Sequence, residues 1–97
     1  MRKVIFIQTR AHVLISGRVQ GVWYRATTRD KAKQLGLTGW VKNTFDGKVE
    51  AMFEGEEDII KEMIAWCREG PRLADVTDVK VDYRKATGEF QDFSVMY

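Results

Sequence analysis

The chain has 97 residues, and that length fits one compact domain. Its formal net charge of +2 is too small to indicate a nucleic-acid partner by itself. The lone Cys67 excludes an internal disulfide bond. The apolar run at residues 4–7 is too short for a secretory signal or a membrane span, so we expect a cytoplasmic protein without membrane contact.

The charge is distributed unevenly along the chain. Residues 1–35 hold eight basic side chains against one acidic side chain, so the acidic excess lies in residues 36–97. The first third therefore makes a positive field that would attract a small anion or a nucleic acid. A solvated basic helix face explains the same pattern, and charge alone favours that simpler interpretation.

The first predicted elements are a strand and a helix. Residues 1–10 are interpreted as an N-terminal extension, although residues 4–7 could instead form an extra strand, and the domain would cover residues 11–97. Residues 11–16 alternate in the manner of a strand. A helical stripe then begins near Tyr24 and ends at Gly36, a residue suited to a left-handed helix end.

A β-hairpin follows, with strands at residues 38–44 and 48–54. A two-residue Asp-Gly loop would pair Val41 with Met52. A three-residue loop would pair Val41 with Ala51 and Asn43 with Val49. The longer loop gathers the apolar side chains on one face, so burial favours this register and turns Asn43 toward the helices.

The second half of the chain predicts a helix and two further strands. Acidic residues 56–58 suit the positive end of a helix, and residues 70–71, Gly-Pro, end it. The apolar stripe of that helix consists of Ile59, Ile60, Met63, Ile64 and Cys67. A strand at residues 76–84 would turn Val79, Val81 and Tyr83 inward, and a short last strand occupies residues 93–97.

The order β-α-β-β-α-β predicts an α+β ferredoxin-like sandwich, with two helices on one face of an antiparallel sheet and a short extra C-terminal strand. In that topology the first two strands run parallel with the third between them, so their carboxyl ends lie at the same edge. The loop at residues 17–25 and the side chain of Asn43 should therefore meet there.

The loop at residues 17–25 connects a strand to the start of a helix. Such a position offers unpaired backbone N–H groups and a positive dipole end, both suited to phosphate oxygens. Gly21 allows the backbone to curl into an anion-binding nest, and Arg25 in the first helical turn can reach over it with a planar cation. Arg18 is the weaker candidate and would support the loop or steer anions.

Two motifs give a specific resemblance. Gly-Arg-Val-Gln-Gly-Val-Trp-Tyr-Arg at residues 17–25, followed by Gly-Trp-Val-Lys-Asn-Thr at residues 39–44, resembles the paired signature of the acylphosphatase family. The similarity runs from about residue 11 to residue 97. Residues 1–10 exceed the usual start, and Tyr24 stands where phenylalanine is common.

The resemblance implies a role for each matching residue. Arg25 resembles the phosphate-binding arginine of the family, and Asn43 resembles its water-positioning asparagine. The backbone that cradles the phosphate would come from Gln20, Gly21, Val22, Trp23 and Tyr24. Because the terminal carboxylate approaches the arginine in some members, a pair between the Tyr97 carboxylate and Arg25 is a further hypothesis.

The function implied is hydrolysis of small acyl phosphates by a monomer, with no cofactor and no metal. Three alternatives stay open. An RNA-recognition domain shares the sandwich, but the expected open sheet face, with Glu50 and Glu54, offers no stacking platform. The second alternative is a subordinate domain, which would resemble the start of larger carbamoyl-transfer maturation proteins. The third alternative is an inactive relative of the family.

Overall fold

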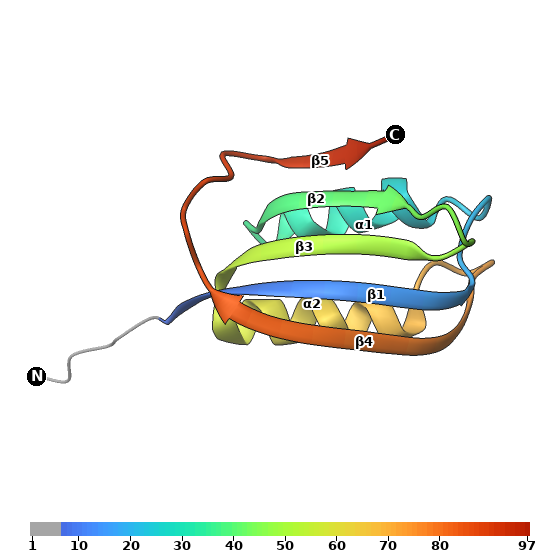
Figure 1. Cartoon of the computed structure of the whole chain (residues 1–97), viewed down its shortest axis with the longest axis horizontal. Helices are drawn as coiled ribbons and strands as arrows, with labels where there is room; N and C mark the ends of the chain where they lie inside the picture. The colour runs from blue at the N-terminus through green and yellow to red at the C-terminus, as the bar shows by residue number, and fades with distance from the viewer. Residues whose placement is uncertain (1–6) are drawn as a thin grey trace, which may run out of the picture.

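The computed structural model describes residues 7–97 as two layers, a sheet with two helices on one face (Figure 1). The elements in chain order are β1 (Gln8–Arg18), α1 (Tyr24–Gln34), β2 (Thr38–Asn43), β3 (Val49–Glu56), α2 (Glu57–Glu69), β4 (Asp75–Lys85) and β5 (Phe93–Met96). Across the sheet the strand order is β4-β1-β3-β2-β5. The predicted ferredoxin-like sandwich and its short extra strand are confirmed.

The sheet is mixed because its last strand differs from the others. β1 to β4 form antiparallel pairs, whereas β5 runs parallel to β2. β1 and β2 both run antiparallel to the intervening β3, so they point the same way and end at the same side of the sheet (Figure 1). That common end holds the residues that the sequence singled out.

The first strand begins earlier than residue 11. β1 starts at Gln8, so residues 8–10 of the expected extension are paired with neighbouring strands. The N–H of Glu57 donates a 2.8 Å hydrogen bond to the carbonyl of Ile7, which fastens the start of β1 to the start of α2. The alternative strand at residues 4–7 lies largely outside the described residues.

The core lies between the sheet and the helices. The alternating residues Ala11, Val13 and Ile15 of β1 are fully buried on the face that the helices cover. α1 packs over β2 and β5, and α2 packs over β1, β3 and β4. Phe53 and Phe93 stack with ring centroids 5.5 Å apart, so the extra strand is anchored in the same core.

The hairpin adopts the register that burial favoured. Val41 pairs with Ala51 and Asn43 pairs with Val49. The N–H of Thr44 donates a 2.8 Å hydrogen bond to the carbonyl of Lys48, and Gly47 takes the left-handed backbone, with φ of 90°, that this loop requires.

Tyr83 lies on the face of the sheet that the sequence predicted, but it is not buried there. Tyr83 pairs with the buried Ala11, but its side chain is 48% exposed. β4 is the edge strand beside β1, so this ring lies at the margin of the helical layer, whereas Val79 on the same strand is buried.

The outer face of the sheet carries a buried ion pair. Arg10 donates from Nε to Glu54 at 2.8 Å, and Glu54 also accepts a hydrogen bond from the N–H of Gly88 at 2.6 Å. Gly88 belongs to the connection from β4 to β5, which passes round one end of the sheet (Figure 1). Burial acts to raise the Glu54 pKa, but these hydrogen bonds outweigh it and hold the pKa below its usual value.

The remaining outer positions of β1 and β3 are polar or aliphatic. His12 contacts Glu50 at 2.6 Å, and Met52 is buried. Within residues 7–97, the outer face of β1 and β3 carries no Phe, Tyr or Trp side chain. Nucleic-acid bases would therefore find no aromatic platform on these two strands. Neither helix within that range is long and apolar enough to cross a membrane.

Candidate active site

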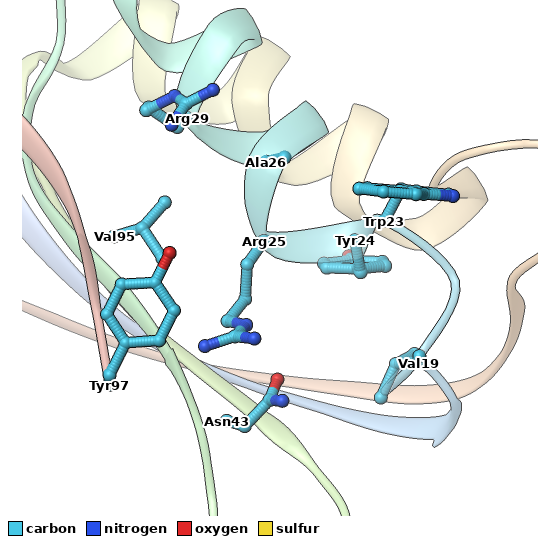
Figure 2. Close-up of a pocket in the computed structure, with 10 residues that line it drawn as sticks. Val19, Trp23, Tyr24, Arg25, Ala26, Arg29, Asn43, Val95 and Tyr97 are labelled. Atoms are coloured by element: carbon cyan, nitrogen blue, oxygen red, sulfur yellow. The ribbon is translucent and has the colours of Figure 1, made fainter.

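A pocket of about 290 Å³ lies at the common end of β1 and β2, beside the start of α1 (Figure 2). It collects residues from the loop, from the first turns of α1, from the end of β2 and from the C-terminal segment. They are Val19, Gly21, Trp23, Tyr24, Arg25, Ala26, Arg29, Asn43, Val95 and Tyr97. The topology thus brings Arg25 and Asn43, far apart in sequence, into one cavity.

The loop before α1 has two residues in the left-handed region. Gly21 has φ of 74°, and Trp23, the residue before the helix, has φ of 66°. A non-glycine residue seldom adopts this conformation, and it costs about 1–3 kcal/mol where it occurs. The strain fits a loop shaped for a ligand.

The backbone N–H groups are a second feature of this loop. Within residues 7–97, no N–H between residues 20 and 25 donates a hydrogen bond to a backbone carbonyl outside the regular elements or to a side chain. α1 begins at Tyr24, so its first N–H groups have no partner inside the helix. Of the predicted cradle residues, Gly21, Trp23 and Tyr24 line the pocket at the positive end of this helix, whereas Gln20 and Val22 do not line it.

Arg25 lies in the first turn of α1, and its guanidinium points into the pocket toward Asn43 (Figure 2). Its Nη1 donates a long hydrogen bond of 3.4 Å to the carbonyl of Met96. The guanidinium carbon also lies 4.9 Å from the centroid of the Tyr97 ring. Within the described residues Arg25 forms no ion pair, so its charge is available to an anion.

The hypothesis of an ion pair between Arg25 and the Tyr97 carboxylate is wrong. The contact is made instead by the aromatic ring and by the preceding carbonyl. A cation over a ring face is attracted by the ring quadrupole without losing its charge. β5 thus steadies the arginine and leaves it cationic.

Asn43 is the last residue of β2, and its carboxamide faces Arg25 across the pocket (Figure 2). Its Oδ1 is buried and has no hydrogen-bond partner within residues 7–97. An unsatisfied buried acceptor costs about 1–3 kcal/mol, so such atoms usually serve a ligand or a bound water. A carboxamide oxygen accepts a hydrogen bond from water, and it is not a base.

The side chain of Gln20 has a role that the sequence did not reveal. Its Nε2 donates to the carbonyl of Thr44 at 2.9 Å and to the carbonyl of Lys48 at 2.8 Å. Both carbonyls belong to the hairpin loop that follows Asn43. The resemblance concerned only the Gln20 backbone, and only the folded structure reveals this bridge between the two motifs.

The adjacent aromatic residues Trp23 and Tyr24 separate. Trp23 is 76% exposed at the pocket rim, whereas Tyr24 is buried against Trp66, with ring centroids 5.7 Å apart. The Tyr24 hydroxyl donates a 2.7 Å hydrogen bond to the carbonyl of Cys67. A tyrosine fits here, where the family often has phenylalanine, because this carbonyl accepts the hydrogen bond of the buried hydroxyl.

Other reactive groups lie away from the pocket. Burial raises the pKa of the Cys67 thiol to about 12, so it stays protonated and inert, as the sequence predicted for a buried helix residue. Arg18 is exposed and does not line the cavity. Residues 7–97 contain no group of three or more His, Cys, Asp or Glu side chains that could hold a metal ion.

Comparisons with known proteins show the family and the fold. The acylphosphatase family model matches residues 11–95. The acylphosphatase of Methylococcus capsulatus is 54% identical over 87 residues, covering 90% of this chain and 95% of that protein. The crystal structure of acylphosphatase from Bacillus subtilis is similar with a TM-score of 0.89 and 32% identity, over 92% of this chain and 99% of that one.

The same fold also occurs inside a larger protein. Full-length HypF, solved in a phosphate- and nucleotide-bound form, is similar with a TM-score of 0.84 and 25% identity, over 99% of this chain but 13% of HypF. The chain therefore corresponds in extent to the small relatives and to one part of HypF.

Proposed function

The chain belongs to the acylphosphatase family, enzymes that hydrolyse small acyl phosphates, and we propose the mechanism by which it does so. A water held by Asn43 attacks the phosphorus atom in line with the departing carboxylate oxygen. Arg25 and the N–H groups of residues 20–24 hold the phosphoryl oxygens. The products are a carboxylate and inorganic phosphate.

The leaving group explains why the site needs little acid–base chemistry. A carboxylate has a conjugate acid with a pKa of roughly 4–5, close to that of Asp or Glu. It departs without a proton, so no general acid is required. Positioning and charge stabilisation remain as the main tasks of the protein.

The cradle supplies the charge stabilisation. The loop residues Gly21, Trp23 and Tyr24 line the same pocket as Arg25, and in the proposal their N–H groups and the guanidinium hold the phosphoryl oxygens. As negative charge builds on these oxygens, donors that are already oriented stabilise it without reorganisation. The left-handed backbone at Gly21 and Trp23 supports this arrangement, because residues in that conformation occur in anion-binding nests of consecutive N–H groups.

The single observation that carries the proposal is the unpartnered Oδ1 of Asn43 in the same pocket as the unpaired Arg25. A water that donates a hydrogen bond to Oδ1 would lie in the same pocket as the guanidinium. Its hydrogen bond to Oδ1 would direct an oxygen lone pair toward the phosphorus atom. We further infer a reducing compartment such as the cytoplasm, since Cys67 is an unpaired thiol. We also propose that the protein acts as a monomer, since the lining residues all come from one chain.

The test is hydrolysis of benzoyl phosphate by the purified chain in excess EDTA. We expect enzymatic release of benzoate and inorganic phosphate at a rate that EDTA leaves unchanged. No hydrolysis by a protein shown to be folded by circular dichroism would contradict the proposal. A rate that EDTA abolishes and added metal restores would contradict its metal-independent form.

A further inference from the structure

The pocket extends beyond the phosphoryl cradle. In Figure 2 the Arg25 guanidinium lies between Val19 on one side and Val95 and Tyr97 on the other, and we therefore consider the pocket in two parts. One part, toward Val19 and Asn43, adjoins the free N–H groups of the loop. The other part is bounded by Arg29, Val95 and Tyr97. A phosphoryl group in the first part leaves the second open to the acyl portion of the same substrate.

This second part contains a second arginine, Arg29. Arg29 follows Arg25 by one helical turn on α1, so the two side chains lie on the same face, with Cβ atoms about 5–6 Å apart. Among residues 7–97, two arginine side chains line the pocket and no Asp or Glu side chain does, so the terminal carboxylate of Tyr97 is the one anionic group on a lining residue. One turn further along, Lys33 already has a partner in Asp92 at 3.5 Å. The excess positive charge is therefore located at the pocket.

Arg29 retains donors for a ligand. Its one ion pair within the described residues joins Nε to Oδ1 of the adjacent Asp30 at 3.2 Å. Both side chains are exposed, and such pairs contribute little. Neither terminal Nη group has a protein hydrogen-bond partner within residues 7–97. These two groups form the edge of the guanidinium that suits a carboxylate or phosphate.

We propose that Arg29 forms a second anion-binding position, and that the favoured substrates are acyl phosphates whose acyl group carries a further anionic group. The inference rests on the proposed function, because it assumes that the phosphoryl group occupies the cradle. Val95, Ala26 and the Tyr97 ring would contact the carbon skeleton between the two anionic ends. Arg29 thereby selects the acyl group without taking part in the chemistry at phosphorus.

The test compares substrates matched in size. 3-Carboxybenzoyl and 4-carboxybenzoyl phosphate carry the second anion at two different distances from the phosphoryl group. 4-Methylbenzoyl phosphate lacks this anion. The proteins are the wild type, Arg29→Gln, Arg29→Lys and the control Lys31→Gln. The control removes the same charge from the same helix, at a residue that does not line the pocket.

The measured quantity is the ratio of kcat/KM for a carboxybenzoyl substrate to kcat/KM for 4-methylbenzoyl phosphate. Arg29→Gln should lower this ratio about threefold to fivefold, mainly through KM, as expected for a partly exposed charge pair. Arg29→Lys should retain part of the preference. Lys31→Gln should leave the ratio unchanged, and added salt should reduce the wild-type ratio.

An unchanged ratio in Arg29→Gln for both carboxybenzoyl substrates would overturn the inference, as would an equal fall in Lys31→Gln. Neither result touches the proposed function, which is judged on the substrates that lack the second anion, benzoyl phosphate and 4-methylbenzoyl phosphate. If the folded wild type did not hydrolyse that neutral substrate, the proposed function would fail first.

Discussion

The side-chain amide of Gln20 donates a 2.9 Å hydrogen bond to the backbone carbonyl of Thr44, the residue that follows Asn43. The same nitrogen also reaches the carbonyl of Lys48 at 2.8 Å. The phosphate loop and the hairpin are therefore held together directly beside the residue proposed to orient water. The distance between phosphoryl group and water would depend on this contact.

Gln20→Glu should disturb that alignment. The carboxylate keeps the shape of the side chain but replaces its donor with an acceptor facing two carbonyl oxygens. We expect kcat to fall about tenfold or more, since small misplacements of reacting groups have large effects. The inhibition constant for inorganic phosphate should change less than kcat does.

Steady-state kinetics with benzoyl phosphate and phosphate inhibition provide this measurement, and Gln91→Glu is the control. Gln91 is exposed in the connection before β5, so its replacement makes the same charge change away from the pocket. An equal loss of kcat and phosphate affinity in Gln20→Glu would indicate general damage to the loop and would contradict a positioning role.

Arg25→Ala and Asn43→Ala should separate binding from turnover. Arg25→Ala should weaken phosphate binding and turnover together, because the guanidinium would contact the phosphoryl group in the bound substrate and in the transition state. Asn43→Ala should spare phosphate binding and reduce kcat by about 10²-fold or more, the usual effect of removing one oriented polar group. Calorimetric phosphate titration beside benzoyl phosphate kinetics measures both, and equal loss of binding in the two variants would reverse the assignment.

Tyr24→Phe should reduce stability and preserve activity. The buried hydroxyl donates to the carbonyl of Cys67 at 2.7 Å, and its removal leaves that carbonyl without this donor. We expect a loss of about 1–3 kcal/mol in the free energy of unfolding. Urea denaturation measures it, with Tyr83→Phe as the control at a half-exposed ring. Equal stability of the two variants would show that the hydrogen bond contributes nothing.

Acid should destabilise the protein partly through Glu54. Its folded-state pKa lies below the usual value, because the hydrogen bonds from Arg10 and Gly88 outweigh the effect of burial. The stabilisation is therefore complete above the unfolded-state pKa of about 4.3 and is lost as pH falls through the lower folded-state value. Glu54→Gln should be less stable near neutral pH and should lose less stability on acidification.

Urea denaturation at a series of pH values between neutral and acid measures this dependence. Glu62→Gln, at an exposed position of α2, is the control. Parallel pH profiles for the wild type and Glu54→Gln would show that the Arg10–Glu54 pair does not link folding to pH.

The sequence was sufficient for features that depend on local pattern or on strand direction. The alternation in β1, the stripe of α2 and the burial of Val41 with Ala51 identified the fold and the hairpin register. Because parallel strands end together, it also followed that Arg25 and Asn43 share a pocket. These deductions needed no knowledge of side-chain conformation.

The features that the sequence did not reveal depend on contacts between distant segments. The Gln20 hydrogen bonds form only when the hairpin loop is in place. The left-handed backbone at Trp23 could not be predicted from the residue type, because tryptophan seldom adopts this conformation. Arg25 meets the Tyr97 ring rather than a carboxylate because of how β5 ends beside α1. Side-chain geometry of this kind emerges only when the whole fold is assembled.

The strand order also bears on self-association. β4 and β5 are the outermost strands, and an exposed strand edge can recruit another chain into a growing sheet. β5 is only four residues long, and β4 carries exposed charged side chains along most of its length. Both features discourage edge-to-edge pairing, so the sheet that aligns the pocket should resist fibril formation even when the protein is concentrated.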